Sequence, residues 1–339
     1  MARQVLQIGI GLLVGGVFLW MALRDVDWGA MGEALRRADY RWLPALIGVA
    51  LLSHLLRAWR WQMLLHPLGV HPGLGKAFSS IMIGYMASYA IPRIGELVRA
   101  AHMARMERAA FSAVLGTIVA ERALDILVLL LALLSVLLLY TDRWAQLAWL
   151  WEGPGLWLKT NTLWVGVAGV LGVVLLFGIW RWYRVRSRNG PLRHFIRSFL
   201  EGLRSVRTLS RPLWFWASTA LMWFAYTVMT YLPLRMFGIA HMDLLDAWAL
   251  MALASIGVVL PSPGGTGTYH FFAQQTLVLL FAVDRNAATL YALLTHGAQL
   301  VAYVLVGWVA LLYTGVGVSF SPPVAEEDNL PSAMRRVNV

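Results

Sequence analysis

The sequence of 339 residues contains no cysteine, so disulfide bonds and thiol chemistry are excluded. Charged residues are also few: they make up 13% of the chain, against about 25% in a typical soluble domain. Hydrophobic residues reach 59%, and the mean hydropathy is +0.65. Apolar runs near 20 residues recur along nearly the whole chain, so the composition predicts an all-α integral membrane protein.

Acidic residues are the scarcer of the charged ones, and the formal net charge is +11. Almost every basic residue is an arginine. In a soluble protein this balance would indicate nucleic acid as a partner. Here the arginines lie between apolar runs, so the predicted partners are membrane lipids with anionic head groups.

Several catalytic and metal-binding patterns are missing. No two histidines have metal-site spacing, and no Gly-x-Ser-x-Gly motif or Gly-Lys-Ser/Thr phosphate loop occurs. His54, His270 and His296 fall in apolar surroundings, where a lone histidine is more often a packed hydrogen-bonding residue than a ligand. We therefore predict neither a metal nor a cofactor.

Six long apolar runs predict six through-spans in one helical bundle over residues 1–318. They cover 5–23, 42–65, 109–140, 163–180, 213–237 and 288–313. The first run is interpreted as a retained span; a signal peptide is the alternative, but no small-residue cleavage site follows it. Residues 319–339 are polar and contain proline, which predicts a disordered cytoplasmic tail.

Shorter apolar pieces cover 76–91, 244–260 and 269–283, and two of them stop at Pro92 and Pro261. The segment 181–211 is rich in arginine, so the positive-inside rule predicts that it lies in the cytoplasm. If the short pieces do not cross, both termini are cytoplasmic, and the loop 24–41 lies outside. We therefore predict two re-entrant hairpins, related as an inverted repeat, in an inner (cytoplasmic) membrane. Tilted or buried spans are the alternative.

The segment 191–209 carries apolar residues at helical spacing, with arginines on the other face. This pattern predicts a helix lying on the cytoplasmic interface. An ordinary positively charged loop is the alternative.

The first candidate motif is 91–99, in which proline and glycine interrupt the helix beside charged residues. Arg93, Glu96 and Arg99 are spaced by three, so on a helix they form one charged stripe. Arginine suits bidentate binding of phosphate. The alternative is a cytoplasmic loop with a surface ion pair.

The second motif is Glu121, Arg122 and Asp125, which lie more than ten residues into an apolar run. Glu121 and Asp125 share one helix face, and Arg122 can pair with Asp125. Charges at this depth are costly and are expected to face a cavity or partners. We predict that the three residues are buried, with a basic partner among Arg57, Arg60, Arg93, Arg99 and Arg122. A functional site and a structural ion-pair lock are both compatible with the pattern.

The third motif is the segment 260–268, whose two prolines and three glycines cannot form a regular helix. Irregular backbone at membrane depth must face protein or water, so we predict that its amides point into a cavity as an anion site. A plain turn between helices is the alternative.

These motifs, in this order, resemble the lysylphosphatidylglycerol synthase transmembrane-region family, the flippase-like membrane half of the multiple peptide resistance factor. The resemblance covers roughly residues 43–313. Tyr269 and His270 stand where members often carry glutamate, and His296 lies in a last span that often carries arginine. The resemblance implies a lipid head-group cavity with these lining residues: Arg93, Glu96, Arg99, Glu121, Arg122, Asp125, Pro261, Ser262, Pro263, Gly264, Gly265, Thr266 and Gly267. His270 and His296, at the positions that depart from the family, are further candidates for substrate binding.

Two classes of function follow. The first is a transporter that moves an amphiphile with an anionic, phosphate-bearing head group between leaflets. The second is an intramembrane lipid-modifying enzyme, and a weaker variant is a non-catalytic membrane partner of a separate lipid-modifying enzyme. The aminoacyl-transferring domain associated with the family is missing, so lysyl-lipid synthesis is not expected. A homo-oligomer is a further alternative for assembly.

Overall fold

The computed structural model describes residues 2–24, 26–91, 94–150 and 191–315 of the chain, and these residues form helices joined by short turns. In chain order the α-helices are α1 (Ala2–Leu23), α2 (Trp28–Arg37), α3 (Leu43–Leu65), α4 (Leu74–Ala90), α5 (Ile94–Met106), α6 (Phe111–Leu139), α7 (Trp144–Leu147), α10 (Pro191–Arg204), α11 (Pro212–Met236), α12 (Leu244–Val259), α13 (Thr268–Phe281) and α14 (Arg285–Thr314). Short 3-10 helices are η1 (Tyr40–Trp42), η2 (His66–Leu68), η3 (Thr141–Arg143), η4 (Ser205–Thr208) and η5 (Pro263–Gly265).

Three helical segments of the described part are long and apolar enough to cross a membrane: Tyr40–Leu68, Phe111–Leu139 and Arg285–Thr314. Leu12–Leu23 and Leu244–Val259 are shorter apolar helices. The helical, lipid-compatible character predicted from composition is therefore confirmed. The predicted span 163–180 and the tail 319–339 lie outside the described residues.

Helix ends follow local sequence. Helix α4 ends at Ala90, two residues before Pro92, and α12 ends at Val259, two residues before Pro261, because proline cannot continue a helix. Asp243 caps α12 by accepting hydrogen bonds from the Leu245 and Asp246 amides. With 17 and 16 residues, α4 and α12 are only about 25 Å long, less than a bilayer core of about 30 Å.

Each short helix is followed by a partner that packs back on it. In the α4–α5 hairpin the backbones meet at Gly84 and Gly95, where a Cβ added to Gly95 would lie 2.3 Å from the Gly84 carbonyl oxygen. In the α12–α13 hairpin a Cβ on Gly257 would lie 2.5 Å from the Thr268 carbonyl oxygen. Only glycine permits these approaches, so both short regions are tightly packed helical hairpins.

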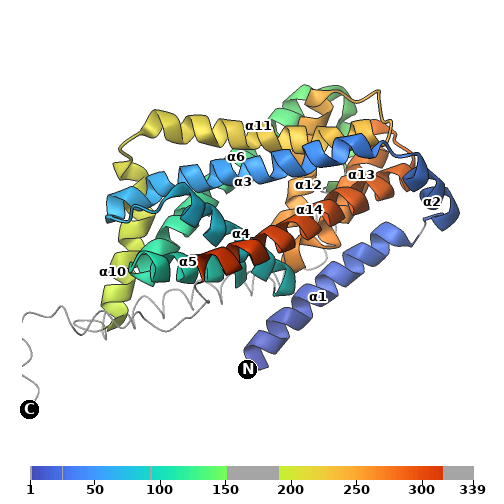
Figure 1. Ribbon diagram of the computed structural model, residues 1–339. Coiled ribbons are helices and arrows are strands. Elements are labelled where there is room, and N and C mark those ends of the chain that lie inside the picture. The colour runs from blue at the N-terminus through green and yellow to red at the C-terminus, as the bar shows by residue number, and fades with distance from the viewer. Residues whose placement is uncertain (1, 25, 92–93, 151–190, 316–339) are drawn as a thin grey trace, which may run out of the picture.

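The two hairpins open toward opposite ends of the bundle (Figure 1). At the open end of the α4–α5 hairpin, Lys76 and Glu107 form an ion pair. This end lies at the same end of the bundle as α10, which we call the α10 end. The open end of α12–α13 lies near α2 (Figure 1), which we call the α2 end. There the Tyr140 hydroxyl donates to Asp246, 2.6 Å away.

The closed tips of the hairpins meet between these ends. The loop around η5 packs against α4, and a Cβ on Gly264 would lie 2.2 Å from Cδ1 of Tyr89. Helix α1 covers the same loop, because Gly15 approaches the backbone at Thr266 and Gly267. The two broken segments of the sequence are therefore neighbours in space.

Of two further segments, 24–41 differs from its prediction and 191–209 agrees with it. The predicted loop 24–41 contains helix α2, which begins at Trp28 after the N-cap residue Asp27, whose side chain accepts from the Gly29 and Ala30 amides. Helix α10 is confirmed as a helix and runs across one end of the bundle (Figure 1). It packs on α6 through Gly202, where an added Cβ would lie 2.1 Å from the Ala113 carbonyl oxygen.

Candidate functional site

Six charged side chains from three helices meet inside the bundle, and we call them the ionic cluster. They are Arg57, Arg60, Arg99, Glu121, Arg122 and Asp125. Helix α3 contributes two arginines spaced by three, and α6 contributes two carboxylates spaced by four, so each pair shares one helix face. Helix α5 contributes Arg99.

The two carboxylates are held by short charged hydrogen bonds. Arg57 Nη1 bridges them, donating to Glu121 Oε1 at 2.5 Å and to Asp125 Oδ2 at 3.1 Å. Arg60 Nη2 donates to Asp125 Oδ1 at 2.7 Å. Arg99 donates to both oxygens of Glu121, at 3.2 and 2.8 Å, and its guanidinium lies 3.7 Å from the Trp61 ring centroid. The predicted burial and pairing of the carboxylates are confirmed.

Arg122 is the exception within the ionic cluster. Its side chain is 37% exposed, whereas that of Glu121 is 0% exposed. Its nitrogens lie 3.8 to 3.9 Å from oxygens of Glu96, Glu121 and Asp125, which is beyond hydrogen-bond distance. Arg122 therefore presents an accessible guanidinium at the edge of a buried network.

The ionic cluster carries more positive than negative charge. Four guanidinium groups face two carboxylates, and Glu96 at the edge is the nearest additional acid. Among the residues that the structure describes, the Nε atoms of all four arginines are buried without a hydrogen-bond acceptor. An uncompensated cation in an apolar interior is costly, so this arrangement favours an added anion.

Aromatic residues line the side of the ionic cluster that faces α4. Tyr226 Oη accepts from Arg57 Nη2 at 2.8 Å. The His54 ring lies 4.4 Å from the Tyr85 ring and 4.6 Å from the Tyr303 ring. In the described structure neither nitrogen of this buried histidine has a hydrogen-bond partner. Sequence analysis identified only an isolated histidine in an apolar run at this place.

The predicted glycine motif forms a compact loop. Positive φ angles at Gly264, Gly265 and Gly267, of 56°, 83° and 84°, are tolerated by glycine and strained for other residues. The Ser262 and Thr268 hydroxyls are hydrogen bonded at 2.7 Å. The prolines Pro261 and Pro263 bracket Ser262 and separate α12 from η5.

The prediction that this loop offers free amides is wrong for four residues. The amides of Ser262, Gly265 and Thr266 donate to carbonyl oxygens within the segment 260–263, and the Gly267 amide donates to His270 Nδ1 at 3.0 Å. Internal hydrogen bonds satisfy buried backbone without a ligand. The loop is therefore a fixed, shaped wall rather than an open cluster of donors.

Two predicted histidines lie directly behind the loop. The His270 and His296 rings are 4.8 Å apart, and His296 Nε2 lies 3.5 Å from the Thr266 hydroxyl. No group of three metal-ligating side chains occurs within the described ranges.

The ionic cluster and the glycine loop are connected along α4. Tyr85 contacts His54 beside the ionic cluster, and Tyr89, one turn later, contacts Gly264 and lies 6.0 Å from the His296 ring. The structure thus brings the second and third motifs to one region of the bundle. In the first motif, Pro92 and Arg93 lie outside the described residues.

The expected stripe in the first motif is only partly correct. Arg99 turns inward to Glu121, and Glu96 lies near Arg122 instead of pairing with Arg99. Sequence analysis did not count Arg57 and Arg60 among the substrate-binding candidates, but their predicted role as possible partners of the buried carboxylates is confirmed. Their burial in an apolar run, at a spacing of three, was the same pattern that singled out Glu121 and Asp125.

Comparisons with known proteins agree with the motif resemblance. The family model described as lysylphosphatidylglycerol synthase TM region matches residues 8–307. A UPF0104 membrane protein of Methanothermobacter thermautotrophicus is 23% identical over 332 residues, covering 91% of this chain and 96% of that protein. No solved structure matches the chain.

Proposed function

The chain belongs to the lysylphosphatidylglycerol synthase TM region family, and on this basis we propose that it moves a lipid with an anionic, phosphate-bearing head group between the leaflets of the cytoplasmic membrane. The observation that carries this proposal is the surplus of guanidinium groups in the ionic cluster, one of which, Arg122, is accessible. A phosphate leaving water needs such donors, because an unpaired charge in an apolar interior is very costly.

Only part of the ionic cluster is free to change partners. Arg57, Arg60 and Arg99 are engaged with carboxylates at hydrogen-bond distance. Arg122 makes only long ion pairs, of 3.8 to 3.9 Å, with its three acidic neighbours. We therefore assign the head-group contact to Arg122, with Glu96 as the acid that a phosphate would displace, and a framework role to the other three arginines.

The hairpins supply the second part of the proposal. Because α4–α5 and α12–α13 open at opposite ends and their tips touch, both suit re-entrant segments of an inverted repeat. The glycine loop would then line a cavity near the bilayer centre, with His270 and His296 behind the loop. In this arrangement the loop shapes the cavity and arginines supply the charge.

Arginine distribution supports the orientation. The arginine-rich segment 181–211 leads into α10 and α11, so we place the α10 end in the cytoplasm. Helix α14 ends there, since Thr314 lies 3.1 Å from His102 of α5. The two termini and the described part of α10 would then face the cytoplasm.

The test is translocation of a labelled anionic phospholipid in reconstituted vesicles. We expect the lipid to become accessible on the opposite leaflet chemically unchanged, and Arg122→Ala to reduce the rate while the protein remains folded. The matched control is Arg37→Ala, which removes an exposed, ion-paired arginine of α2 and is expected to transport normally. A chemically altered lipid would indicate an enzyme, and equal rates in both variants would refute the role of Arg122.

A further inference from the structure

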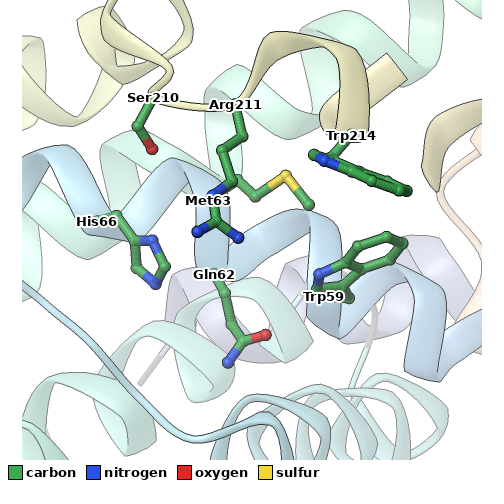
Figure 2. A pocket seen from close by; sticks show the side chains of 7 residues that line it. All are labelled: Trp59, Gln62, Met63, His66, Ser210, Arg211 and Trp214. Carbon is green, nitrogen blue, oxygen red and sulfur yellow. The ribbon is translucent and has the colours of Figure 1, made fainter. Parts of the chain in front are cut away.

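A pocket of about 310 Å³ lies between α3 and α11 at the α10 end, outside the ionic cluster. Its lining combines two indoles, a thioether and several polar groups: Trp59, Gln62, Met63, His66, Ser210, Arg211 and Trp214. Figure 2 shows the Arg211 side chain extending into the space between His66 and Gln62, with the two indoles on the other side. We propose that this pocket binds the phosphate of a membrane phospholipid with a net anionic head group, from the leaflet at the α10 end.

The charge in the pocket suits an anion. Arg211 is exposed, and its guanidinium points into the pocket (Figure 2). None of the pocket's lining residues is acidic. Helix α11 begins directly after Arg211, with Pro212 in its first turn, so the first amides of a 25-residue helix lie beside the guanidinium and add a favourable field for negative charge.

The surroundings of the pocket identify the anion as a lipid rather than a soluble phosphate. On α3, Leu52 and Leu55 are exposed and precede Trp59 by seven and four residues, which places all three on one stripe. On α11, exposed Leu221 follows Trp214 by seven residues and shares its stripe. The polar pocket therefore lies at the end of an apolar seam.

The arginine, the two indoles and the leucines follow one another in the order in which a phospholipid presents its phosphate, its interfacial region and its acyl chains. The Trp59 and Trp214 rings are 5.9 Å apart, and tryptophan favours the depth at which head groups meet acyl chains. Acyl chains would lie along the leucines of the seam, while the phosphate reaches Arg211. A free phosphate would use only the polar part of this surface.

The site is separate from the transport site. Arg211 does not belong to the ionic cluster, and Arg60, the nearest cluster residue in sequence to Met63, is fully buried and directed toward Asp125 and Thr219. Lipid binding here can therefore be measured without transport, and the site stands even if the proposed function fails.

The experiment is native mass spectrometry of the full chain, purified with an equal mixture of phosphatidylglycerol and phosphatidylcholine. We expect the wild type to retain phosphatidylglycerol preferentially and Arg211→Ala to lower that preference about tenfold, the loss of one charged hydrogen-bonded contact. Arg211→Lys is expected to keep part of the preference. Arg207→Ala, which removes an exposed arginine of η4 that does not line the pocket, is the matched control.

A second variant uses the absence of cysteine. Ser210→Cys, modified with a bulky maleimide, places a plug in the pocket and is expected to lower retained phosphatidylglycerol, whereas the unmodified variant retains it. An unchanged lipid preference in Arg211→Ala and in the plugged protein would overturn the proposal. Displacement of the retained lipid by inorganic phosphate at concentrations equal to those of the lipid would assign the pocket to free phosphate and also overturn it.

Discussion

The two hairpins have similar shapes and different chemistry. Helix α5 of the first hairpin is attached to the bundle by Arg99, which is paired with Glu121 and stacked on Trp61. The second hairpin, together with its glycine loop, has no charged residue between 247 and 283, and hydroxyl, histidine and backbone hydrogen bonds hold it. The two oppositely oriented hairpins therefore differ in how they are held: a buried ion pair attaches the first, and neutral hydrogen bonds stabilise the second.

Removing a carboxylate from the ionic cluster, which attaches the first hairpin, should have the largest effect on stability. In Glu121→Ala the guanidinium groups of Arg57 and Arg99 lose their shared partner while remaining buried. We expect a loss of about 3–5 kcal/mol, as for removal of one member of a buried ion pair. Thermal unfolding in detergent measures it.

The control for this variant is Glu33→Ala, which breaks an exposed ion pair with Arg37. Exposed pairs contribute about 0–1 kcal/mol, so its melting temperature should stay close to that of the wild type. Equal melting temperatures for the two variants would show that the ionic cluster does not stabilise the bundle.

A substitution in the glycine loop of the uncharged second hairpin should have the next largest effect on stability. Gly264→Ala places a Cβ 2.2 Å from a ring carbon of Tyr89, at a φ of 56°. Backbone strain and overpacking together should cost about 2–4 kcal/mol. Unfolding of the purified variant tests this value.

Two comparisons separate the causes. Gly238→Ala has a similar φ, 69°, but no atom within 4 Å of the new Cβ, so it measures strain alone. The double variant Gly264→Ala/Tyr89→Ala removes the clashing ring and should recover part of the loss. If the double variant loses as much unfolding free energy as the two single variants lose together, the hairpin tips are not in contact.

The smallest predicted effects compare the loss of one charge-assisted hydrogen bond with the loss of one neutral hydrogen bond. Tyr226→Phe removes the acceptor of an Arg57 hydrogen bond, and Tyr291→Phe removes the donor to the Thr230 carbonyl. We expect about 1–2 kcal/mol for the first and about 1 kcal/mol for the second, since charge-assisted bonds are stronger. Chemical denaturation of both variants under one condition checks the order, and the reverse order would contradict it.

Local features of the fold could be predicted because they depend on neighbouring residues. Pro92 and Pro261 locate the ends of α4 and α12, and the spacing of Glu121 and Asp125 gives their shared face. The candidate partners of these carboxylates could be predicted as arginines in or beside apolar runs, but the individual pairs could not, because Arg57 lies 64 residues away from Glu121 in sequence. Helical periodicity carries no information on such long-range contacts.

The same limit explains the errors in the site. Glycines at 264, 265 and 267 correctly predicted irregular backbone, but whether amides bond internally depends on the path of the whole loop. Likewise Glu96 and Arg99 have the spacing of an ion pair, but Arg99 pairs with Glu121 of α6 instead. Tertiary contacts override the local preference in both cases.

The most direct test of the central claim is the ratio of phosphatidylglycerol to phosphatidylcholine translocation, measured in vesicles for the wild type and for Arg122→Glu. If the accessible guanidinium recognises the phosphate-bearing anionic lipid, the wild type favours phosphatidylglycerol and Arg122→Glu lowers the ratio about tenfold, equivalent to one charged hydrogen-bonded contact. A ratio that is the same in both proteins would contradict the claim that the ionic cluster selects the charge of the head group.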